Sequence, residues 1–466
     1  MLDNVIQCVH RFIWGWPLIL LVLFVGVYMS IRTRFVQVRL LKHAFQQAVK
    51  REPGGNGEVS VFASLCTTLS ATIGTGNVVG VAGAVVLGGP GALLWMEVAA
   101  FFGMAVKYAE AFLAVQYREC VGDGRYIGGP FLYIERGMGK RWRWLAKAFS
   151  LFGVLAGLLG IGSLTQSSSI TVALEELFPI ASQNVAFSVG GKPVSVVTVI
   201  GAAAVTFAAA FVIIGGVKRI AGMSQVVVPL MALLYVVAVV VIVLCNLSRV
   251  PAVISLVFHS AFSPQAALGA VAGISLKETM QKGIGRGIFS NEAGLGSAPI
   301  AAAAAKTDHP VKQGLVFMTA TFIDTIVICT LTGLAVLLTG AWQQAGLEGV
   351  EITAYAWQTG LPLPPPISTA LLMICLVFFS FTTIVGWEYY YECCAIYLVG
   401  NGRRIIAVFR WLYILAVFVG PFISVSSVWN IAEISNALMS LPNLIALLSL
   451  GAVVEKDTLA YLRKST

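Results

Sequence analysis

A membrane-length apolar stretch interrupted by glycines constrains this chain more than any other feature. Residues 62–119 begin as an apolar helix but carry Gly74, Thr75, Gly76 and Asn77 inside it. Glycine disfavours a helix, and lipid tolerates a broken helix only where the freed backbone groups are buried in protein or line a cavity. Such a break presents N–H groups that bind anions and C=O groups that bind cations. The pattern predicts a site for a zwitterion and a cation or, alternatively, a glycine-mediated contact between helices.

The composition places the chain in a broad class. It has 466 residues, of which 58% are hydrophobic and 11% charged, whereas a soluble domain carries roughly 25% charged residues. Long apolar runs, in place of short alternating segments, exclude a β-barrel. The eight cysteines form no C-x-x-C or C-x-x-H pattern, so we expect no disulfide framework, metal centre or other cofactor. We predict an all-α polytopic membrane protein.

Apolar runs and basic loops together predict the topology. Runs of about 20 residues suggest about eleven transmembrane helices, at 12–31, 61–86, 91–116, 145–178, 194–215, 223–246, 265–288, 311–340, 367–398, 404–424 and 427–453. Every second loop is basic, whereas the loop at 341–366 contains no Lys or Arg. The positive-inside rule then puts the N-terminus outside and the C-terminus in the cytosol. The net charge of +9 reflects this distribution, so no nucleic-acid partner is expected.

Once the first helix is set aside, the remaining ten divide into two sets of five with opposite orientations. Each set begins with a glycine-interrupted helix, at 74–77 and at Gly269, Gly273 and Ser275. Paired interrupted helices in two inverted halves point to a substrate site near the middle of the membrane. We divide the chain into an extra N-terminal helix (12–31), a basic amphipathic cytosolic segment (32–58), and two five-helix repeats (59–246 and 250–455).

Three stretches resemble the alanine/glycine:cation symporter family, also called sodium:alanine symporters. They are GTGN at 74–77 with the residues that follow it, GIFSNEAGLGSAP at 287–299, and FFSFTTIVGWEYYY at 378–391. The resemblance implies a LeuT-type core of five plus five inverted helices, preceded by one extra helix. It also implies import of alanine, glycine or a similar small neutral amino acid together with a cation, usually Na⁺.

The first group of candidate substrate ligands lies at the two interruptions. We expect the substrate carboxylate near the N–H groups of Thr75, Gly76 and Asn77, where small residues let a ligand approach the backbone. A tight helix–helix contact is the alternative. Ala272 and Gly273 would face the ligand and supply carbonyls for its ammonium group.

A second group depends more on the resemblance. Gln166 lies in a run of small and apolar residues, and by resemblance it contacts the amino acid; an interhelical hydrogen bond is the alternative. Ser168 stands where the resemblance leads us to expect Asn, which leaves the exact substrate open. Trp387 resembles the aromatic residue that closes the site from the cytosolic side, although Trp is also common at membrane interfaces.

Hydroxyl groups and carbonyls suggest a sodium site. Hard cations prefer oxygen ligands, and by resemblance the hydroxyls of one helix combine with carbonyls of the broken helix. The hydroxyls would come from Ser380, Thr382 and Thr383, and the carbonyls from Ala71, Thr72 and Gly74. The alternative is that the hydroxyls bond back to the preceding helical turn.

Asp324 is the most isolated carboxylate and is a candidate for cation or proton coupling, because intramembrane acids are often functional; a structural role is the alternative. Glu97 is a further acid within an apolar run, and Glu292 suggests a gate or a cap on the Ala-rich helix that follows it. A proton-coupled carrier or exchanger is therefore the main rival to a Na⁺ symporter. A channel would need a continuous polar face, and no enzyme motif is present.

With no long targeting segment, we expect a prokaryotic plasma-membrane protein whose partners are the amino acid, Na⁺ and lipid.

Overall fold

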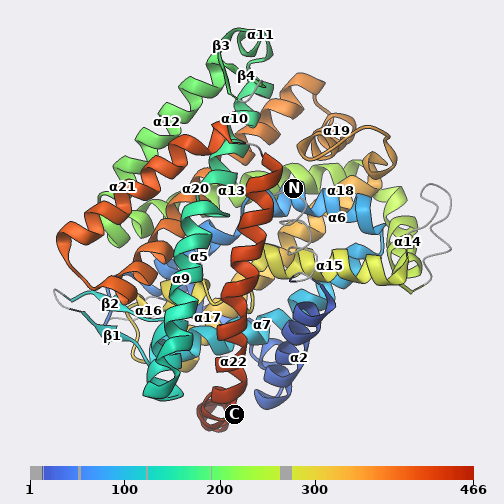
Figure 1. Cartoon of the computed structure of the whole chain (residues 1–466). Helices are drawn as coiled ribbons and strands as arrows, with labels where there is room; N and C mark the ends of the chain where they lie inside the picture. The colour runs from blue at the N-terminus through green and yellow to red at the C-terminus, as the bar shows by residue number, and fades with distance from the viewer. Residues whose placement is uncertain are drawn as a thin grey trace.

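The chain folds into a bundle of long helices with two short β-hairpins (Figure 1). The structure is a computed structural model that describes residues 13–465, apart from residue 14 and the stretches 51–53, 122–123, 190–191, 263–274 and 424. One end of the molecule carries α11 and the β3–β4 hairpin, and the C-terminal end of α22 lies at the opposite end (Figure 1).

The helices of the first half are α2 (Trp16–Arg32), α3 (Val36–Arg39), α4 (Leu41–Val49), α5 (Val61–Thr72), α6 (Val81–Gly88), α7 (Ala92–Gln116), α8 (Pro130–Leu132), α9 (Arg143–Leu159), α10 (Leu164–Leu177), α11 (Pro179–Ser182), α12 (Val196–Ile213) and α13 (Gly216–Cys245). Those of the second half are α14 (Val250–Phe262), α15 (Leu276–Asn291), α16 (Ala298–Ala303), α17 (Pro310–Thr321), α18 (Thr330–Leu338), α19 (Val350–Gly360), α20 (Pro365–Val399), α21 (Arg403–Val419) and α22 (Val425–Ser465).

The remaining elements are short. The π-helical segments are Gly76–Gly80, Tyr133–Gly137 and Phe322–Cys329, and the 3₁₀ turns are Lys140–Trp142, Leu247–Arg249, Ala341–Gln343 and Gly420–Phe422. The antiparallel hairpins pair β1 (Glu119–Cys120) with β2 (Tyr126–Ile127), and β3 (Val185–Val189) with β4 (Lys192–Ser195). These hairpins are the departure from the all-α fold predicted from the sequence.

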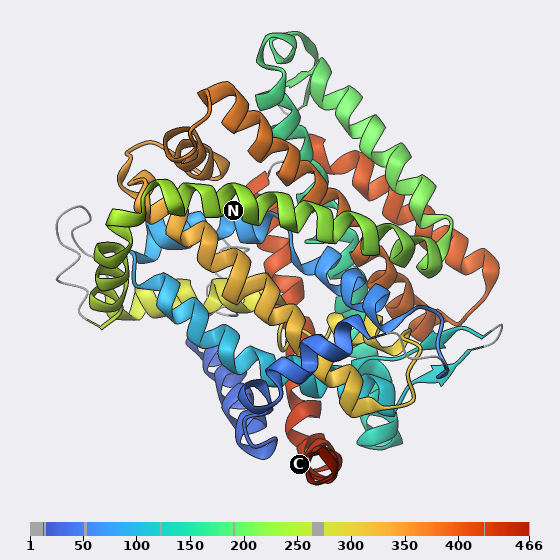
Figure 2. The same ribbon diagram turned by 180° about the vertical axis from the view of Figure 1, so that it is seen from behind.

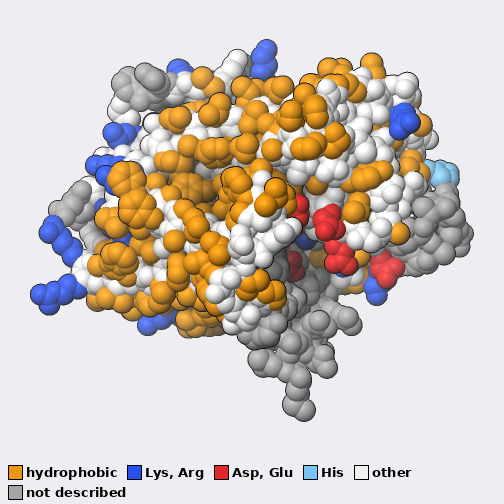
Figure 3. Space-filling view, turned by 90° about the horizontal axis from the view of Figure 1, so that it is seen from above, with side chains coloured by type: hydrophobic (Ala, Val, Ile, Leu, Met, Phe, Trp, Pro, Cys, Tyr) orange, Lys and Arg blue, Asp and Glu red, His pale blue; other side chains and the backbone are white. Residues whose placement is uncertain are grey.

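The bundle has the apolar exterior of a membrane protein. In the described part of the chain, eight helices are long and apolar enough to cross a membrane, or nine if α5 and the segment Gly76–Gly88, bent by 54°, form one span. Side chains on the outer face of α13 are exposed and apolar, and this helix lies along the surface of the bundle when it is seen from behind (Figure 2). Hydrophobic side chains are also spread across much of the face in Figure 3. A helical membrane protein is confirmed, whereas the count of eleven spans and the five-plus-five repeat stay predictions.

The first predicted break is present and has a local cause. Ser60 caps the start of α5 by accepting a hydrogen bond from the Ala63 N–H at 3.1 Å. The helix ends at Thr72, and the Gly74 N–H then turns to the Asn77 side chain, whose Oδ1 accepts it at 2.9 Å. A π-helical turn follows before α6 begins. Such π-turns recur at functional sites.

A further interruption, which the sequence did not indicate, follows α15. The predicted positions Gly269 and Gly273 lie outside the described residues, and Ser275 is the N-cap of α15 in a capping box with Glu278. Helix α15 ends at Asn291, and its C-cap, Glu292, has the left-handed φ of 55° that L-residues rarely adopt. Residues 293–297 then lead into α16. A third interruption, which sequence analysis missed, separates α9 from α10 at residues 160–163, within the predicted span 145–178.

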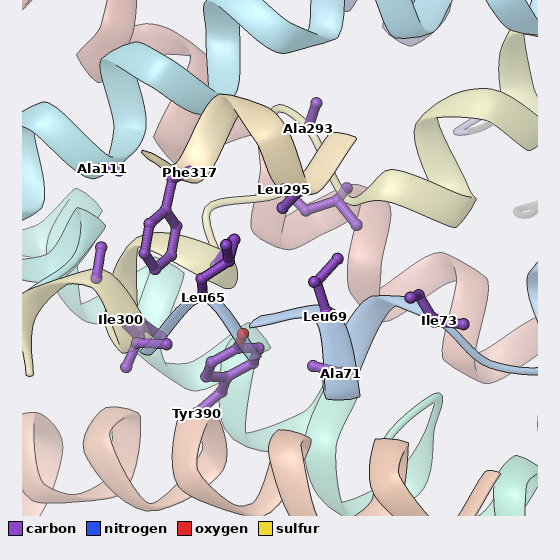
Figure 4. Close-up of a cluster of buried hydrophobic side chains, with 14 of the residues drawn as sticks. Leu65, Leu69, Ala71, Ile73, Ala111, Ala293, Leu295, Ile300, Phe317 and Tyr390 are labelled. Atoms are coloured by element: carbon purple, nitrogen blue, oxygen red, sulfur yellow. The ribbon is translucent and has the colours of Figure 1, made fainter. Parts of the chain in front are cut away.

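The core surrounds these breaks. Helix α7 packs between α15 and α17, while α20 packs against α5, α9 and α10. Figure 4 shows Leu65, Leu69, Ala71 and Ile73 of the α5 region close to side chains from the loop after α15, from α16 and from α20. The broken helices therefore lie in the interior, where the bundle can enclose a site.

Candidate transport site

A small cavity lies between the two broken helices. Its lining residues come from the first break, the α9–α10 break, α10, the end of α15 and α20: Ala71, Thr72, Gly74, Thr75, Gly76, Ile161, Gln166, Phe289, Ser290, Glu292 and Thr383. The cavity measures about 10 Å³, which is roughly enough for one water molecule. The site is thus enclosed, and its walls bring together half of the residues predicted for substrate and cation.

Gln166 presents an unused acceptor to this cavity. Its side chain is buried, and its Nε2 lies 3.4 Å from Thr75 Oγ1. Its Oε1 has no hydrogen-bond partner among the described residues. A Cβ built on Gly74 would lie 3.6 Å from this oxygen, so the amide faces the break. A buried amide oxygen without a partner is costly, and a donor or cation in the cavity would satisfy it.

Oxygen atoms from α20 meet the end of α5 at the same place. Thr383 Oγ1 is a donor to the Phe379 carbonyl at 3.0 Å and lies 3.3 Å from the Ile73 carbonyl. Ser380 is fully buried, and its hydroxyl has no hydrogen-bond partner in the described part of the chain. Thr382 instead faces Met231 on α13, with its Oγ1 3.6 Å from the sulfur. Of the three predicted hydroxyl ligands, only Thr383 lines the cavity.

Asn77 does not line the cavity, because its side chain is hydrogen-bonded to Asp324. Asn77 Nδ2 is a donor to Asp324 Oδ1 at 2.8 Å and to Ser290 Oγ at 2.9 Å. Asp324 Oδ2 accepts hydrogen bonds from Ser290 Oγ and Thr325 Oγ1, both at 2.9 Å. Asp324 lies in the π-helical segment Phe322–Cys329 and is fully buried. The carboxylate therefore ties the first broken helix to the second.

Glu292 and Trp387 close the cavity toward the C-terminal half of α20. Trp387 is fully buried and donates its Nε1–H to Glu292 Oε1 at 2.9 Å, while Ser297 Oγ donates to the other carboxylate oxygen at 2.5 Å. A Cβ on Gly162 would lie 2.6 Å from the Trp387 Cβ, so the α9–α10 break packs directly on this residue. Glu292 also has a left-handed backbone conformation, and such backbone strain is common at functional sites.

Phe289 and Arg286 lie on the other side of the cavity. The Arg286 guanidinium lies over the Phe289 ring, 5.0 Å from its centroid. A second cavity of about 390 Å³ begins there and is lined by α6, α15 and Glu433 of α22. Phe289 lines both cavities, so one aromatic ring with a cation on its face separates them.

The remaining predicted residues are not all at the cavity. Ser168 is buried but does not line it, and Ala272 and Gly273 lie outside the described residues. Sequence analysis did not assign Ile161 or Phe289 to the site. The glycines on both sides of Ile161, at 160 and 162, were a usable signal for a third break.

The Trp387–Glu292 contact can be tested on its own. We expect Trp387→Phe to lower the melting temperature of the protein in detergent, because a buried carboxylate oxygen that loses its donor costs about 1–3 kcal/mol. Trp357→Phe is the matched control, since Trp357 is also fully buried but its Nε1 has no partner in the described structure. Equal losses in the two variants would show that the hydrogen bond contributes nothing beyond packing.

Broken helices that enclose a polar cavity at the centre of an apolar bundle define a secondary transporter. The model of the sodium:alanine symporter family matches residues 1–466. The chain belongs to this family of cation-coupled amino acid symporters; it is an integral membrane protein and not an enzyme. The resemblance read from the three sequence stretches is thereby confirmed.

Two relatives and one solved structure show how far the similarity extends. The sodium/alanine symporter AgcS of Methanococcus maripaludis is 42% identical over 98% of this chain and 97% of its own length. A probable sodium/glutamine symporter, GlnT of Bacillus subtilis, is 34% identical over 100% of this chain and 92% of its own. The crystal structure of MhsT in complex with L-phenylalanine is 16% identical, with a TM-score of 0.61 over 87% of this chain and 93% of that one. This last likeness shows the shared LeuT-type fold.

Proposed function

We propose that the protein imports alanine, glycine or a similar small neutral amino acid together with Na⁺ across a prokaryotic plasma membrane. The observation that carries this proposal is the enclosed cavity at the first break, where the Gln166 amide oxygen and the Thr383 hydroxyl face each other across Gly74. The name of the AgcS relative, a sodium/alanine symporter, supports the same pairing of ion and substrate.

The cation would bind between α5 and α20. The carbonyls of Ile73 and Phe379 both lie within hydrogen-bond distance of Thr383 Oγ1. The Ser380 hydroxyl, which has no hydrogen-bond partner among the described residues, is nearby on the same helix. Neutral oxygens of this kind suit a hard monovalent cation. The C=O groups at the end of α5 have no helical partner and add negative potential. Ala71 and Thr72 also line the cavity, as predicted for the cation site.

The amino acid would bind on the other side of Gly74. Its carboxylate would lie at the start of the second half-helix, near Thr75 and Gly76, where the backbone is open to approach and the helix dipole favours an anion. The Gln166 oxygen would accept a hydrogen bond from its ammonium group. Ile161 and Phe289 supply the apolar wall, and the narrow space between them favours the smallest side chains.

Alternating access would use the two closures. The Trp387–Glu292 contact would open toward the side predicted to be cytosolic, and the Phe289–Arg286 contact would open toward the outside. We propose that the inverted repeats at 59–246 and 250–455 supply the moving pair of broken helices. Asp324 would keep that pair together, since it bonds to Asn77 in one and Ser290 in the other.

The first experiment is uptake of labelled alanine into proteoliposomes under an inward Na⁺ gradient or an inward H⁺ gradient. We expect accumulation with Na⁺ alone. Accumulation driven only by H⁺ would replace the sodium proposal with the proton-coupled alternative. Competition by excess glycine, glutamine or phenylalanine in the same assay would define the substrate class. Of these three, we expect only glycine to reduce alanine uptake.

Two neighbouring threonines provide a sharper test of the cation site. We expect Thr383→Ala to raise the Na⁺ concentration for half-maximal uptake by about tenfold, which corresponds to about 1.4 kcal/mol of lost binding. Thr382→Ala is the matched control, because its hydroxyl faces Met231 on α13. A similar rise in both variants, or in neither, would argue against a cation at the Thr383 hydroxyl.

A further inference from the structure

A cavity lined by arginines lies away from the transport site, where α21 begins. It measures about 490 Å³ and lies between the turn that joins α12 to α13 and the first turns of α21. Its lining residues are Arg125, Ile214, Asn401, Arg403, Ile406, Ala407, Arg410, Trp411 and Ile414. Three of these side chains are cationic and none is acidic, so the lining favours an anion.

Only part of this positive charge is neutralised by the protein. Arg125 and Arg410 both bond to Glu392 of α20, each at 2.5 Å, and Arg410 also lies 3.9 Å from Glu388. The Nε of Arg125 is buried and has no hydrogen-bond partner in the described residues. Arg403 is exposed, and the described residues offer it no ion pair. Two of the three guanidinium groups thus bond to Glu392 and Glu388, and the charge of Arg403 and the Nε–H of Arg125 remain to bind an anion.

The remainder of the cavity is suited to a membrane surface. Ile406, Ile414 and Trp411 give it an apolar wall, and Trp411 is 60% exposed on the outside of the bundle. Val408 and Leu415, on the same helix, are also exposed apolar side chains. Trp is enriched at the level of lipid head groups. A ligand here would meet cationic groups at one end and the apolar surface of the bundle at the other.

The start of α21 adds to this preference. Its first turn contains no acidic residue, no side chain caps it, and it carries Arg403 and Arg404 instead. Cations at the positive end of a helix dipole are unfavourable unless an anion is bound there. The positive-inside rule explains why basic residues occur on this side, but it does not explain an arginine-lined cavity.

We propose that this cavity binds the phosphoryl head group of an anionic phospholipid, with Arg403 as the principal contact and Trp411 beside the glycerol and upper acyl chains. Basic pockets between transmembrane helices are known sites for such head groups. The bound lipid would join the start of α21 to the α12–α13 turn. Through Arg410 and Glu392 it would also reach the end of α20, the helix that carries Thr383 and Trp387.

The test measures lipid binding by the purified full-length protein and does not depend on transport. Native mass spectrometry in detergent would compare phosphatidylglycerol with phosphatidylcholine for the wild type, Arg403→Gln and Arg404→Gln. Arg404 is the matched control, because it is the exposed neighbour with the same charge and does not line the cavity. We expect a preference for phosphatidylglycerol that Arg403→Gln reduces about fivefold and that Arg404→Gln leaves near the wild-type value.

The result can also go against the proposal. Equal retention of the two lipids, or equal losses in the two arginine variants, would leave only a general attraction of basic residues for anionic lipid. A competition arm with inorganic phosphate and glycerol 3-phosphate would separate the two sources of a phosphoryl group. Displacement of the lipid by either at equal concentration would overturn a lipid site in favour of a soluble anion site.

Discussion

Replacing Gly74 by alanine is expected to weaken transport strongly while the protein still folds. The backbone of Gly74 is not in the left-handed region, so alanine can adopt its conformation. The added Cβ would lie 2.9 Å from Thr383 Oγ1 and 3.6 Å from Gln166 Oε1. To relieve the first contact, the Thr383 hydroxyl would have to leave the position where it meets the Ile73 carbonyl. The added methyl group therefore either fills the cavity or displaces the Thr383 hydroxyl, which is the proposed cation ligand.

The size of this effect follows from the cost of overpacking. Extra methyl groups in a well-packed site cost typically about 1–3 kcal/mol, which corresponds to roughly 5- to 150-fold in affinity. Gly222→Ala in α13 is the control, because a Cβ there would meet no other atom within 4 Å. Uptake and size-exclusion profiles of both variants in proteoliposomes and detergent would be compared. Normal uptake by Gly74→Ala would place the transport site elsewhere.

Sequence patterns identified the broken helix better than they identified its surroundings. The glycines at 74 and 76 and the resemblance to one family were enough to predict Gln166 and Thr383, and the structure places both at the cavity with Thr75 and Gly76. The position of the break needed only a local signal, since a break must expose its backbone groups to something, whereas Gln166 and Thr383 also needed the resemblance. Their roles in binding stay predictions until they are measured.

The direction in which each side chain points was not available from the sequence. Thr382 and Thr383 are equivalent in a hydropathy pattern, but they point about 100° apart on a helix of 3.6 residues per turn, and helix packing turns only Thr383 toward the break. Asn77 could have faced the ligand. It bonds instead to Asp324, which is 247 positions away, and a single sequence gives no indication of such a pairing.

Glu292 illustrates a different kind of limit. Its motif, SNEAG, was recognisable, but a gate and a helix cap were equally consistent with it. In the structure Ser297, not Glu292, is the N-cap of the Ala-rich helix α16, so the predicted cap was wrong. Glu292 is instead the C-cap of α15 and accepts a hydrogen bond from Trp387. The left-handed φ of Glu292 was also not predictable from the residue type, because Glu has no intrinsic preference for this region.

Asp324→Asn is the second change for which we expect a large effect. The carboxylate accepts hydrogen bonds from Asn77, Ser290 and Thr325. The amide that replaces this carboxylate has one oxygen, so it can accept the hydrogen bond from Asn77 only if its NH₂ group, which accepts none, faces Ser290 and Thr325. Thr325 Oγ1 already accepts a hydrogen bond from Asn291 at 3.0 Å, so its own proton would lose its acceptor. We expect lower thermal stability and at least about tenfold slower uptake, since hydrogen bonds to charged groups contribute about 1.5–3 kcal/mol each.

A double-mutant cycle would separate the structural role of Asp324 from proton carriage. If Asp324 acts by tying the two broken helices together through Asn77, Asp324→Asn and Asn77→Ala remove the same tie, and their effects on Na⁺-driven uptake will be strongly non-additive. If the carboxylate instead carries a proton, the losses in the two variants would be additive, and Asp324→Asn would abolish H⁺-driven uptake in particular.

Glu97→Gln is the matched control, because this second acid accepts one hydrogen bond, from Thr330 at 2.7 Å. A loss in Glu97→Gln as large as that in Asp324→Asn would count against a specific role for the Asp324 tie, because the two breaks would then be held together by general polar packing.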